Sequence, residues 1–245
     1  MGRVPEPHVI IPARLASTRF PRKVLADVGG LPMVQRVWQS AVDAVGADRA
    51  HIATDSDEVA EVARGFGADV QMTSPDARCG TERIAEIAER LDASALINVQ
   101  GDDPFIPSSL ITDSIDAFVD RGLAVCTPIF RMSVDEGQTP HIVKVTRSSS
   151  GRALYFSRSV IPHDRDGVED GDGLWGHVGL YVYSPEAVKE YRGFGESELE
   201  RREKLEQLRF LENDIPIATF VTEYRPRAID VPEDLEALIA EGIDD

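Results

Sequence analysis

Positively charged side chains gather in one short stretch near the N-terminus, residues 14–23. Guanidinium groups bind phosphate oxygens in pairs, and a lysine ammonium adds a compact positive charge. Two hydroxyl groups stand between the cations, so we predict that the stretch binds a triphosphate. It lacks the G-x-x-x-x-G-K-S/T pattern of a Walker loop, and its composition alone also fits a solvated basic loop. The residues concerned are Arg14, Ser17, Thr18, Arg19, Arg22 and Lys23.

Carboxylates form a second candidate site in the motif N-V-Q-G-D-D-P, residues 98–104. Asp102 and Asp103 follow a glycine, which lets the backbone approach a ligand closely, and carboxylate oxygens suit Mg²⁺ bound to nucleotide phosphates. Asp102 is the first predicted metal ligand. Asp230, in A-I-D-V-P-E-D-L, is the candidate for the second. A polar turn for the first motif and a helix N-cap for the second are the plain alternatives.

Buried strands must position these residues. The basic stretch follows the apolar run 9–11, which Pro12 ends, and the carboxylate motif follows the apolar run 95–99. Strands alternate with helices through the first half, which predicts the α/β class, with a Rossmann-like, mostly parallel sheet flanked by helices. Such sheets bind ligands at the carboxyl ends of their strands. The expected strands are 9–11, 50–54, 70–72 and 95–99, and the expected helices are 33–45, 56–64, 80–91 and 113–119.

The second half begins with closely spaced β-rich segments and short connections, which predict a small antiparallel β lobe within residues 123–184. We expect one domain, residues 1–245, that includes this lobe. The expected strands of the lobe are 123–130, 142–145, 153–156 and 178–183, and a helix at 199–211, a strand at 217–221 and a helix at 232–239 follow it.

Composition limits the partners and the compartment. The chain has 26 Lys and Arg against 43 Asp and Glu, a formal net charge of −17, which argues against nucleic acid or an anionic membrane as partner. Cys79 and Cys126 form no C-x-x-C pair, so neither a zinc site nor a disulfide framework is indicated. No basic leader or long apolar span is visible, and we expect a cytoplasmic protein.

The basic stretch also carries a family resemblance. I-P-A-R-x-x-S-T-R-x-P-x-K, at residues 11–23, resembles the signature of the CMP-Kdo synthetases, the 3-deoxy-manno-octulosonate cytidylyltransferases. Q-G-D-D-P-F-I-P, at residues 100–107, is similar to that family's Q-G-D-E-P-x-I-P, with Asp103 in place of Glu. The sialate synthetases lack this second motif, so it separates the two groups.

Later motifs extend the resemblance over almost the whole chain. C-G-T-E-R, at residues 79–83, resembles S-G-T-E-R, which lies near the cytosine and ribose, and L-Y-F-S-R-x-x-I-P-x-D-R, at residues 154–165, is also similar. Asp230 matches the Asp of the family's D-T-P-E-D. Residues 201–204 depart from the family's usual H-I-E-M.

The resemblance implies transfer of CMP from CTP to the anomeric hydroxyl of Kdo, with Mg²⁺, in a homodimer whose small lobe serves sugar binding or dimerisation. The product, CMP-Kdo, serves lipopolysaccharide synthesis. Arg14, Lys23, Asp102 and Asp230 are the implied catalytic residues, the last two as metal ligands. The implied CTP site contains Ala13, Arg14, Ser17, Arg19, Lys23, Thr81, Arg83 and Gln100, and the implied sugar site contains Arg158, His177, Tyr181, Glu206 and Gln207.

Several alternatives stay open at this point. The residues around Thr81 also fit a helix capping box, His177 also fits a structural histidine, and Glu206 with Gln207 also fits a solvated helix face. For the whole protein, the alternatives are a cytidylyltransferase acting on another 2-keto sugar acid, 8-amino-Kdo or a sialate, and a nucleotide-binding protein without turnover.

Overall fold

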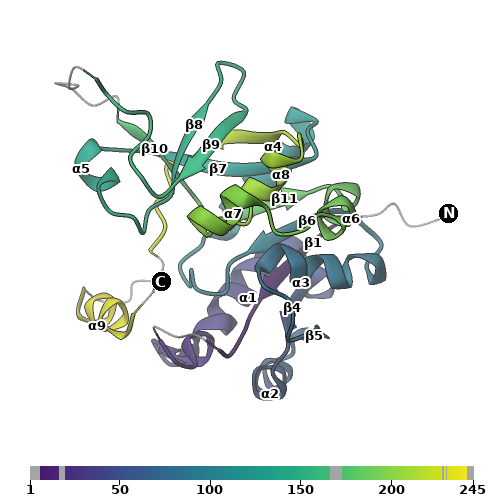
Figure 1. Cartoon of the computed structure of the whole chain (residues 1–245). Helices are drawn as coiled ribbons and strands as arrows, with labels where there is room; N and C mark the ends of the chain where they lie inside the picture. Colours follow the sequence, from purple (N-terminus) through teal and green to yellow (C-terminus); the bar gives the residue numbers. More distant parts are fainter. Residues whose placement is uncertain (1–5, 17–19, 166–172, 228, 230, 242–245) are drawn as a thin grey trace. The chain divides into compact units, whose positions relative to one another are not determined.

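The computed structural model describes residues 6–16, 20–165, 173–227, 229 and 231–241 (Figure 1). The chain divides into two compact units. Unit 1 contains residues 1–112 and 226–245, and unit 2 contains residues 113–225. No helix in the described ranges is long and apolar enough to span a bilayer.

Unit 1 is built on a parallel sheet with the strand order β5-β4-β1-β6. Residues 9–11 of β1 and 96–97 of β6 are fully buried, as expected for strands covered on both faces. Because neighbouring strands are parallel, their carboxyl ends lie at one edge of the sheet, and the loops that follow β1 and β6 leave the sheet together. The strands are β1 (Glu6–Pro12), β4 (Ala50–Thr54), β5 (Asp69–Met72) and β6 (Ala93–Val99).

Amphipathic helices cover this sheet. Helix α1 contacts β1 and β4, α2 contacts β4 and β5, and α3 contacts β1 and β6. The buried face of α1 follows the helical spacing of its apolar residues, from Met33 to Val45, and the Ser56 hydroxyl caps α2 by accepting a hydrogen bond from Val59 N. These helices are α1 (Met33–Val45), α2 (Asp57–Gly65) and α3 (Gly80–Ile87). Helix α4 (Ser108–Arg121) begins in unit 1 and lies mostly in unit 2, and α9 (Pro232–Glu241) is the last helix of unit 1.

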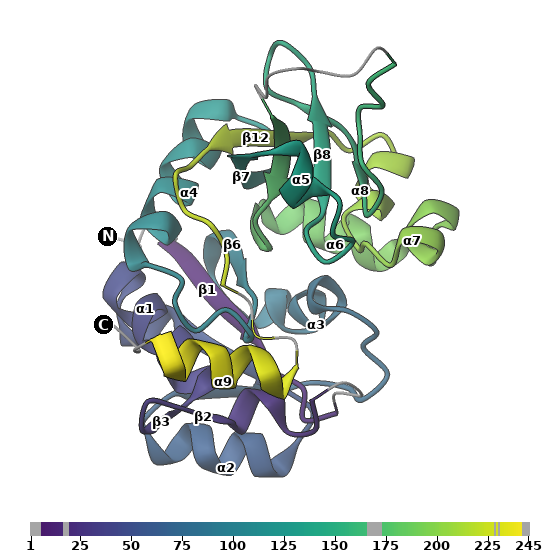
Figure 2. The same ribbon diagram turned by 90° about the vertical axis from the view of Figure 1, so that its left-hand side faces the viewer.

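A short hairpin, β2 (Asp27–Val28) and β3 (Leu31–Pro32), follows the basic stretch. Both glycines of its two-residue turn, Gly29 and Gly30, have positive φ, as a tight hairpin turn requires. Figure 2 shows α9 beside this hairpin. Leu235 and Leu238 of α9 pack on a buried cluster that includes Val28, so the C-terminal helix covers the hairpin.

Unit 2 is organised around β7 (Val125–Met132), which pairs with three strands. Two of them are antiparallel to it, and the third, β12, is parallel. A hairpin of β8 and β9 extends the sheet, because β8 also pairs with β10. The partners are β8 (Lys144–Arg147), β9 (Ala153–Ser157), β10 (Leu174–His177), β11 (Leu180–Tyr183) and β12 (Ile217–Val221), and the helices are α5 (Val134–Gly137), α6 (Pro185–Gly193), α7 (Glu198–Glu203) and α8 (Leu208–Glu212).

The single helix expected at 199–211 is wrong. The chain forms α7 and α8 with a turn at residues 204–207 between them. Lys204 ends α7 in the left-handed conformation, with φ of 56°, and its N–H bonds to the carbonyl of Glu200 at 2.7 Å. Lysine gives no sign of this conformation in the sequence, because glycine is the residue that favours it.

Other expected elements have different bounds. Helix α3 ends at Ile87 and continues as a 3₁₀ turn to Arg90, and α4 begins at Ser108, ahead of the predicted 113. Strand β10 was missed, because Gly176 interrupts its apolar pattern. A Cβ at this glycine would lie 2.4 Å from a ring carbon of Phe130. The Phe130 ring can therefore pack against β10 only because residue 176 has no side chain.

Candidate active site

The basic stretch and the carboxylate motif lie together at the carboxyl ends of β1 and β6. These strands are paired in parallel, with Ile10 opposite Asn98. Lys23, whose residue is only 8% exposed, donates a hydrogen bond from Nζ to Oδ2 of Asp102 at 2.8 Å. The predicted cation and the predicted metal ligand are therefore direct neighbours. Gly101 and Asp102 also form a turn, as the plain alternative expects, and this turn brings the carboxylate to the basic stretch.

Gly101 allows this close approach. A Cβ at this position would lie 3.0 Å from the carbonyl oxygen of Pro12 and 3.6 Å from Cγ2 of Ile11. The two loops thus meet backbone to backbone, with no room for a side chain between them.

Replacing Gly101 by Val is expected to push these loops apart. Overpacking of this kind lowers the free energy of unfolding by about 1–3 kcal/mol, and displacing Asp102 from Lys23 should also reduce turnover by about tenfold or more. Urea denaturation and steady-state kinetics measure the two effects. Gly195→Ala is the control, because a Cβ at Gly195 meets nothing within 4 Å; equal effects of both variants would contradict the packing argument.

Asp102 has the features of a metal ligand. Its side chain is 36% exposed, one carboxylate oxygen binds Lys23, and the other accepts no hydrogen bond from any described residue. Its carbonyl oxygen accepts a hydrogen bond from Ile229 N at 3.2 Å. Asp230, the second predicted ligand, comes next in the chain but lies outside the described residues. A hard carboxylate oxygen beside a basic loop is the type of ligand that suits Mg²⁺, so the metal role of Asp102 stays a prediction.

The other residues that are predicted to bind CTP differ from one another in solvent exposure. Ala13 is buried and its N–H bonds to the carbonyl of Ala53 at 2.9 Å, whereas Arg14 is exposed. Gln100 is half-buried. Ser17 and Arg19, like Thr18, lie outside the described residues, so their roles stay predictions.

Thr81 and Arg83 are buried in α3. Arg83 donates a hydrogen bond to Thr73 Oγ1 and its Nη2 lies 3.6 Å from Oδ2 of Asp55, so its guanidinium group ties α3 to neighbouring loops. The capping-box alternative around Thr81 is wrong, because Cys79 is the N-cap and its side chain makes no capping bond. Binding of CTP by Thr81 and Arg83 stays a prediction.

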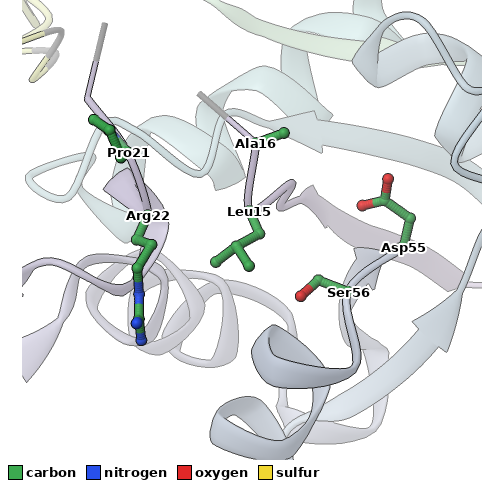
Figure 3. Close-up of a pocket in the computed structure, with 6 residues that line it drawn as sticks. All are labelled: Leu15, Ala16, Pro21, Arg22, Asp55 and Ser56. Carbon is green, nitrogen blue, oxygen red and sulfur yellow. The ribbon is translucent and has the colours of Figure 1, made fainter. Parts of the chain in front are cut away.

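A pocket of about 460 Å³ lies beside the basic stretch. Figure 3 shows that the loop after β1 supplies one wall and the turn between β4 and α2 supplies the other. Arg22 pairs with Glu58 of α2, so it ties these walls together. Sequence reasoning missed the acidic wall, although its position directly after a buried strand was a usable signal. The lining residues are Leu15, Ala16, Pro21, Arg22, Asp55 and Ser56.

The predicted sugar residues all belong to unit 2. His177 is buried, with its ring 5.1 Å from Phe156 and 5.2 Å from Tyr181 between centroids. Thr127 donates its hydroxyl hydrogen to the carbonyl of Leu180 at 2.6 Å, so the 2.9 Å contact between Thr127 Oγ1 and His177 Nε2 assigns the proton to Nε2. The other ring nitrogen, Nδ1, accepts no hydrogen bond from any described residue, and sugar binding by His177 stays a prediction.

His177 should make stability depend on pH. Burial lowers its pKa from 6.5 to about 3. The unfolded chain therefore binds a proton below pH 6.5 that the folded protein does not take up until about pH 3, so stability is complete above pH 6.5 and falls as pH decreases below it. One proton gives a slope of at most about 1.4 kcal/mol per pH unit.

The measurement is the free energy of unfolding in urea between pH 7.5 and pH 4.5, and His177→Gln is expected to flatten its slope. His141→Gln removes an exposed histidine and serves as the control. A slope that changes no more in the first variant than in the second would contradict the assignment of a buried, neutral His177.

Gln207 and Glu206 lie in the turn between α7 and α8. Gln207 is 3% exposed, and its Nε2 has no hydrogen-bond partner among the described residues. The solvated-face alternative is therefore wrong for Gln207, and a buried, unsatisfied amide marks a place for a ligand or a water. Glu206 is half-buried, and Tyr181 is buried with its ring stacked on that of Tyr183.

Arg158 uses its side chain to join three segments of unit 2. Its Nε donates to the carbonyl of Glu203 at 2.8 Å, Nη1 to that of Pro140 at 3.0 Å, and Nη2 to that of Lys204 at 3.5 Å. Glu203 in turn accepts from Arg158 N at 2.9 Å. These contacts give Arg158 a structural role that sequence reasoning missed, and binding of a substrate carboxylate by its remaining N–H groups stays a prediction.

The mostly parallel sheet of unit 1, flanked by helices and followed by a mixed, largely antiparallel unit 2, matches the fold of the nucleotide-diphospho-sugar transferases. A solved structure of CMP:2-keto-3-deoxy-manno-octonic acid synthetase complexed with CTP has a TM-score of 0.90 and 35% identity, and the match covers 97% of this chain and 100% of that one. The inositol-1-phosphate CTP transferase from T. maritima shares the fold, with a TM-score of 0.67 and 15% identity over 100% of both chains. The predicted α/β class is confirmed.

Sequence comparison gives the family. The cytidylyltransferase family profile matches residues 8–217. The 3-deoxy-manno-octulosonate cytidylyltransferase of Chlorobium limicola is 41% identical over 93% of this chain and 94% of its own length. The enzyme of the same name from Trichlorobacter lovleyi is 43% identical over 92% of this chain and 94% of its own length. The chain belongs to the 3-deoxy-manno-octulosonate cytidylyltransferase family of nucleotidyltransferases, as the motifs predicted.

Proposed function

We propose that the protein transfers CMP from CTP to the anomeric hydroxyl of Kdo, giving CMP-Kdo and pyrophosphate for lipopolysaccharide synthesis. The Lys23–Asp102 pair at the ends of β1 and β6 carries the proposal, because it joins a phosphate-binding cation to a carboxylate with an available oxygen. Family membership over more than nine-tenths of the chain supports the choice of substrates.

In the proposed reaction, the anomeric oxygen forms a bond to the α-phosphorus of CTP while the bond from that phosphorus to the bridging oxygen breaks. Pyrophosphate leaves with the bonding electrons, and the hydroxyl proton passes to water. Lys23, Arg14 and Arg19 offset the negative charge that grows on the phosphate oxygens. Catalysis is then mainly positioning and electrostatic stabilisation.

Asp102 and Asp230 are the proposed ligands of Mg²⁺. When bound, the ion supplies positive charge to the triphosphate and the leaving pyrophosphate. Lys23 fixes one oxygen of Asp102 and thereby sets the direction in which the other faces. Ala13, Ser17, Thr81, Arg83 and Gln100 complete the proposed CTP site.

The proposed sugar site lies in unit 2. His177 accepts a hydrogen bond from a sugar hydroxyl at Nδ1, and Gln207 donates one from Nε2, which is buried and has no hydrogen-bond partner among the residues that the structure describes. Arg158 binds the carboxylate, and Tyr181 and Glu206 line the site. The proposal also includes a homodimer, which the family resemblance implies, and a cytoplasmic location. The charge of −17 supports the absence of nucleic-acid and membrane partners.

Pyrophosphate release from CTP and Mg²⁺ tests the proposal directly. Release is expected with Kdo and not in a blank without sugar. Parallel reactions with 8-amino-Kdo and a sialate show which sugar acid is the preferred substrate. Faster pyrophosphate release with either of them than with Kdo would reassign the substrate. No release with any of them, while CTP still binds, would leave a nucleotide-binding protein without turnover.

A further inference from the structure

The turn at residues 204–207 carries Gln207 but has little regular structure of its own. It begins at Lys204, in the left-handed conformation, and ends where α8 begins. The direction of the Gln207 amide therefore depends on how firmly α7 and α8 are held relative to each other.

A buried ion pair holds these two helices. Arg209 of α8, only 1% exposed, donates from Nε to Oε2 of Glu200 at 2.7 Å and from Nη2 to Oε1 at 2.6 Å. Glu200 is itself fixed in α7, because its Oε2 also accepts from Ser197 N at 3.2 Å in a capping box. The two parallel hydrogen bonds fix the angle between the partners as well as their separation.

Tyr191 of α6 supports both the pair and the turn. Its ring lies 4.2 Å from the guanidinium carbon of Arg209, and its hydroxyl donates to the carbonyl of Glu206 at 3.3 Å. A buried ion pair adds little to stability compared with apolar packing, so its directional geometry is the property that distinguishes it here.

We propose that the Glu200–Arg209 pair is a positioning device of the sugar-acid site, which holds the turn so that the unpartnered Nε2 of Gln207 meets the sugar acid. This inference rests on the proposed function. Glu200 and Arg209 contact no substrate in it; they act through Gln207. A positioning residue of this kind sets the KM for the sugar acid while leaving the CTP site of unit 1 unchanged.

Arg209→Lys is the first test, since lysine keeps the charge but cannot form two parallel hydrogen bonds. The KM for Kdo is expected to rise by about tenfold, with the KM for CTP unchanged, because small misplacements of a binding group are costly. The control is Arg202→Ala, which removes an exposed Arg–Glu pair, Arg202–Glu198 at 2.7 Å, from α7, the helix that carries Glu200. Unchanged KM values for both substrates in Arg209→Lys, or a rise in both, would overturn the inference.

A double-mutant cycle with Gln207→Ala tests whether Arg209 acts through Gln207. In that background Arg209→Lys is expected to add no further increase in the KM for Kdo, whereas additive effects would contradict the proposal. Tyr191→Phe is the second variant, used if Arg209→Lys does not fold, and should raise the same KM by a smaller factor. Wild-type turnover separates the two proposals: an inactive wild type defeats the proposed function, and an active wild type with an additive cycle defeats only this inference.

Discussion

Replacing Asp102 by Asn is expected to lower kcat by about a thousandfold, because the available carboxylate oxygen that is proposed to bind Mg²⁺ becomes a neutral amide oxygen or an amide nitrogen. The side chain keeps its size, so the loop after β6 should stay folded. Its partner Lys23 is only 8% exposed and would lose its anionic neighbour, which adds to the loss.

Initial rates of pyrophosphate release at several Mg²⁺ concentrations measure this effect, and a binding titration with CTP shows whether the nucleotide still enters. Asp113→Asn, at an exposed position of α4, is the matched control and should leave kcat unchanged. A kcat for Asp102→Asn within a few-fold of the wild type at saturating Mg²⁺ would remove Asp102 from the catalytic set.

Replacing Lys23 by Met is expected to lower kcat by about a hundredfold to a thousandfold, the usual cost of losing one group that stabilises charge in the transition state. Methionine fills much of the same buried space, so packing is largely kept. The KM for CTP should also rise, because Lys23 is proposed to bind the triphosphate before the reaction as well as during it.

Comparison of kcat and KM for CTP with those for Kdo distinguishes this effect from a general loss of structure. The KM for Kdo should remain unchanged, since Lys23 belongs to unit 1 and the proposed sugar residues to unit 2. Arg36→Met, which removes a cation bound to the carbonyls of Val28 and Gly29, serves as the control. Equal losses in the two variants would contradict a specific role for Lys23.

Much of unit 1 was predictable from the sequence because its signals are local. The bounds of α1 and β4 match the prediction residue for residue, since apolar spacing and flanking glycine or proline define them. The pairing of Lys23 with Asp102 was also predictable in outline, because parallel strands bring the loops at their carboxyl ends together.

The features that were missed depend on backbone breaks and tertiary contacts that the local sequence pattern does not show. The burial of Gln207 follows from the break at Lys204, which no glycine marks, and from the ion pair between Glu200 and Arg209. Arg158 was expected at the substrate, yet three of its hydrogen bonds go to backbone carbonyls that only the tertiary structure brings near. Motif resemblance identifies such residues without showing what they contact.

The central position of β7 in the sheet of unit 2 stabilises the orientation of His177. Thr127, which orients His177, lies in the strand that pairs with β10, β11 and β12. Local opening of a protein begins at frayed ends and edge strands, while a strand bonded on both sides is released only when its whole unit unfolds. The backbone amides of β7 are therefore expected to be among the slowest in unit 2 to exchange with solvent, and Thr127 keeps its place beside His177 for as long as this strand stays paired.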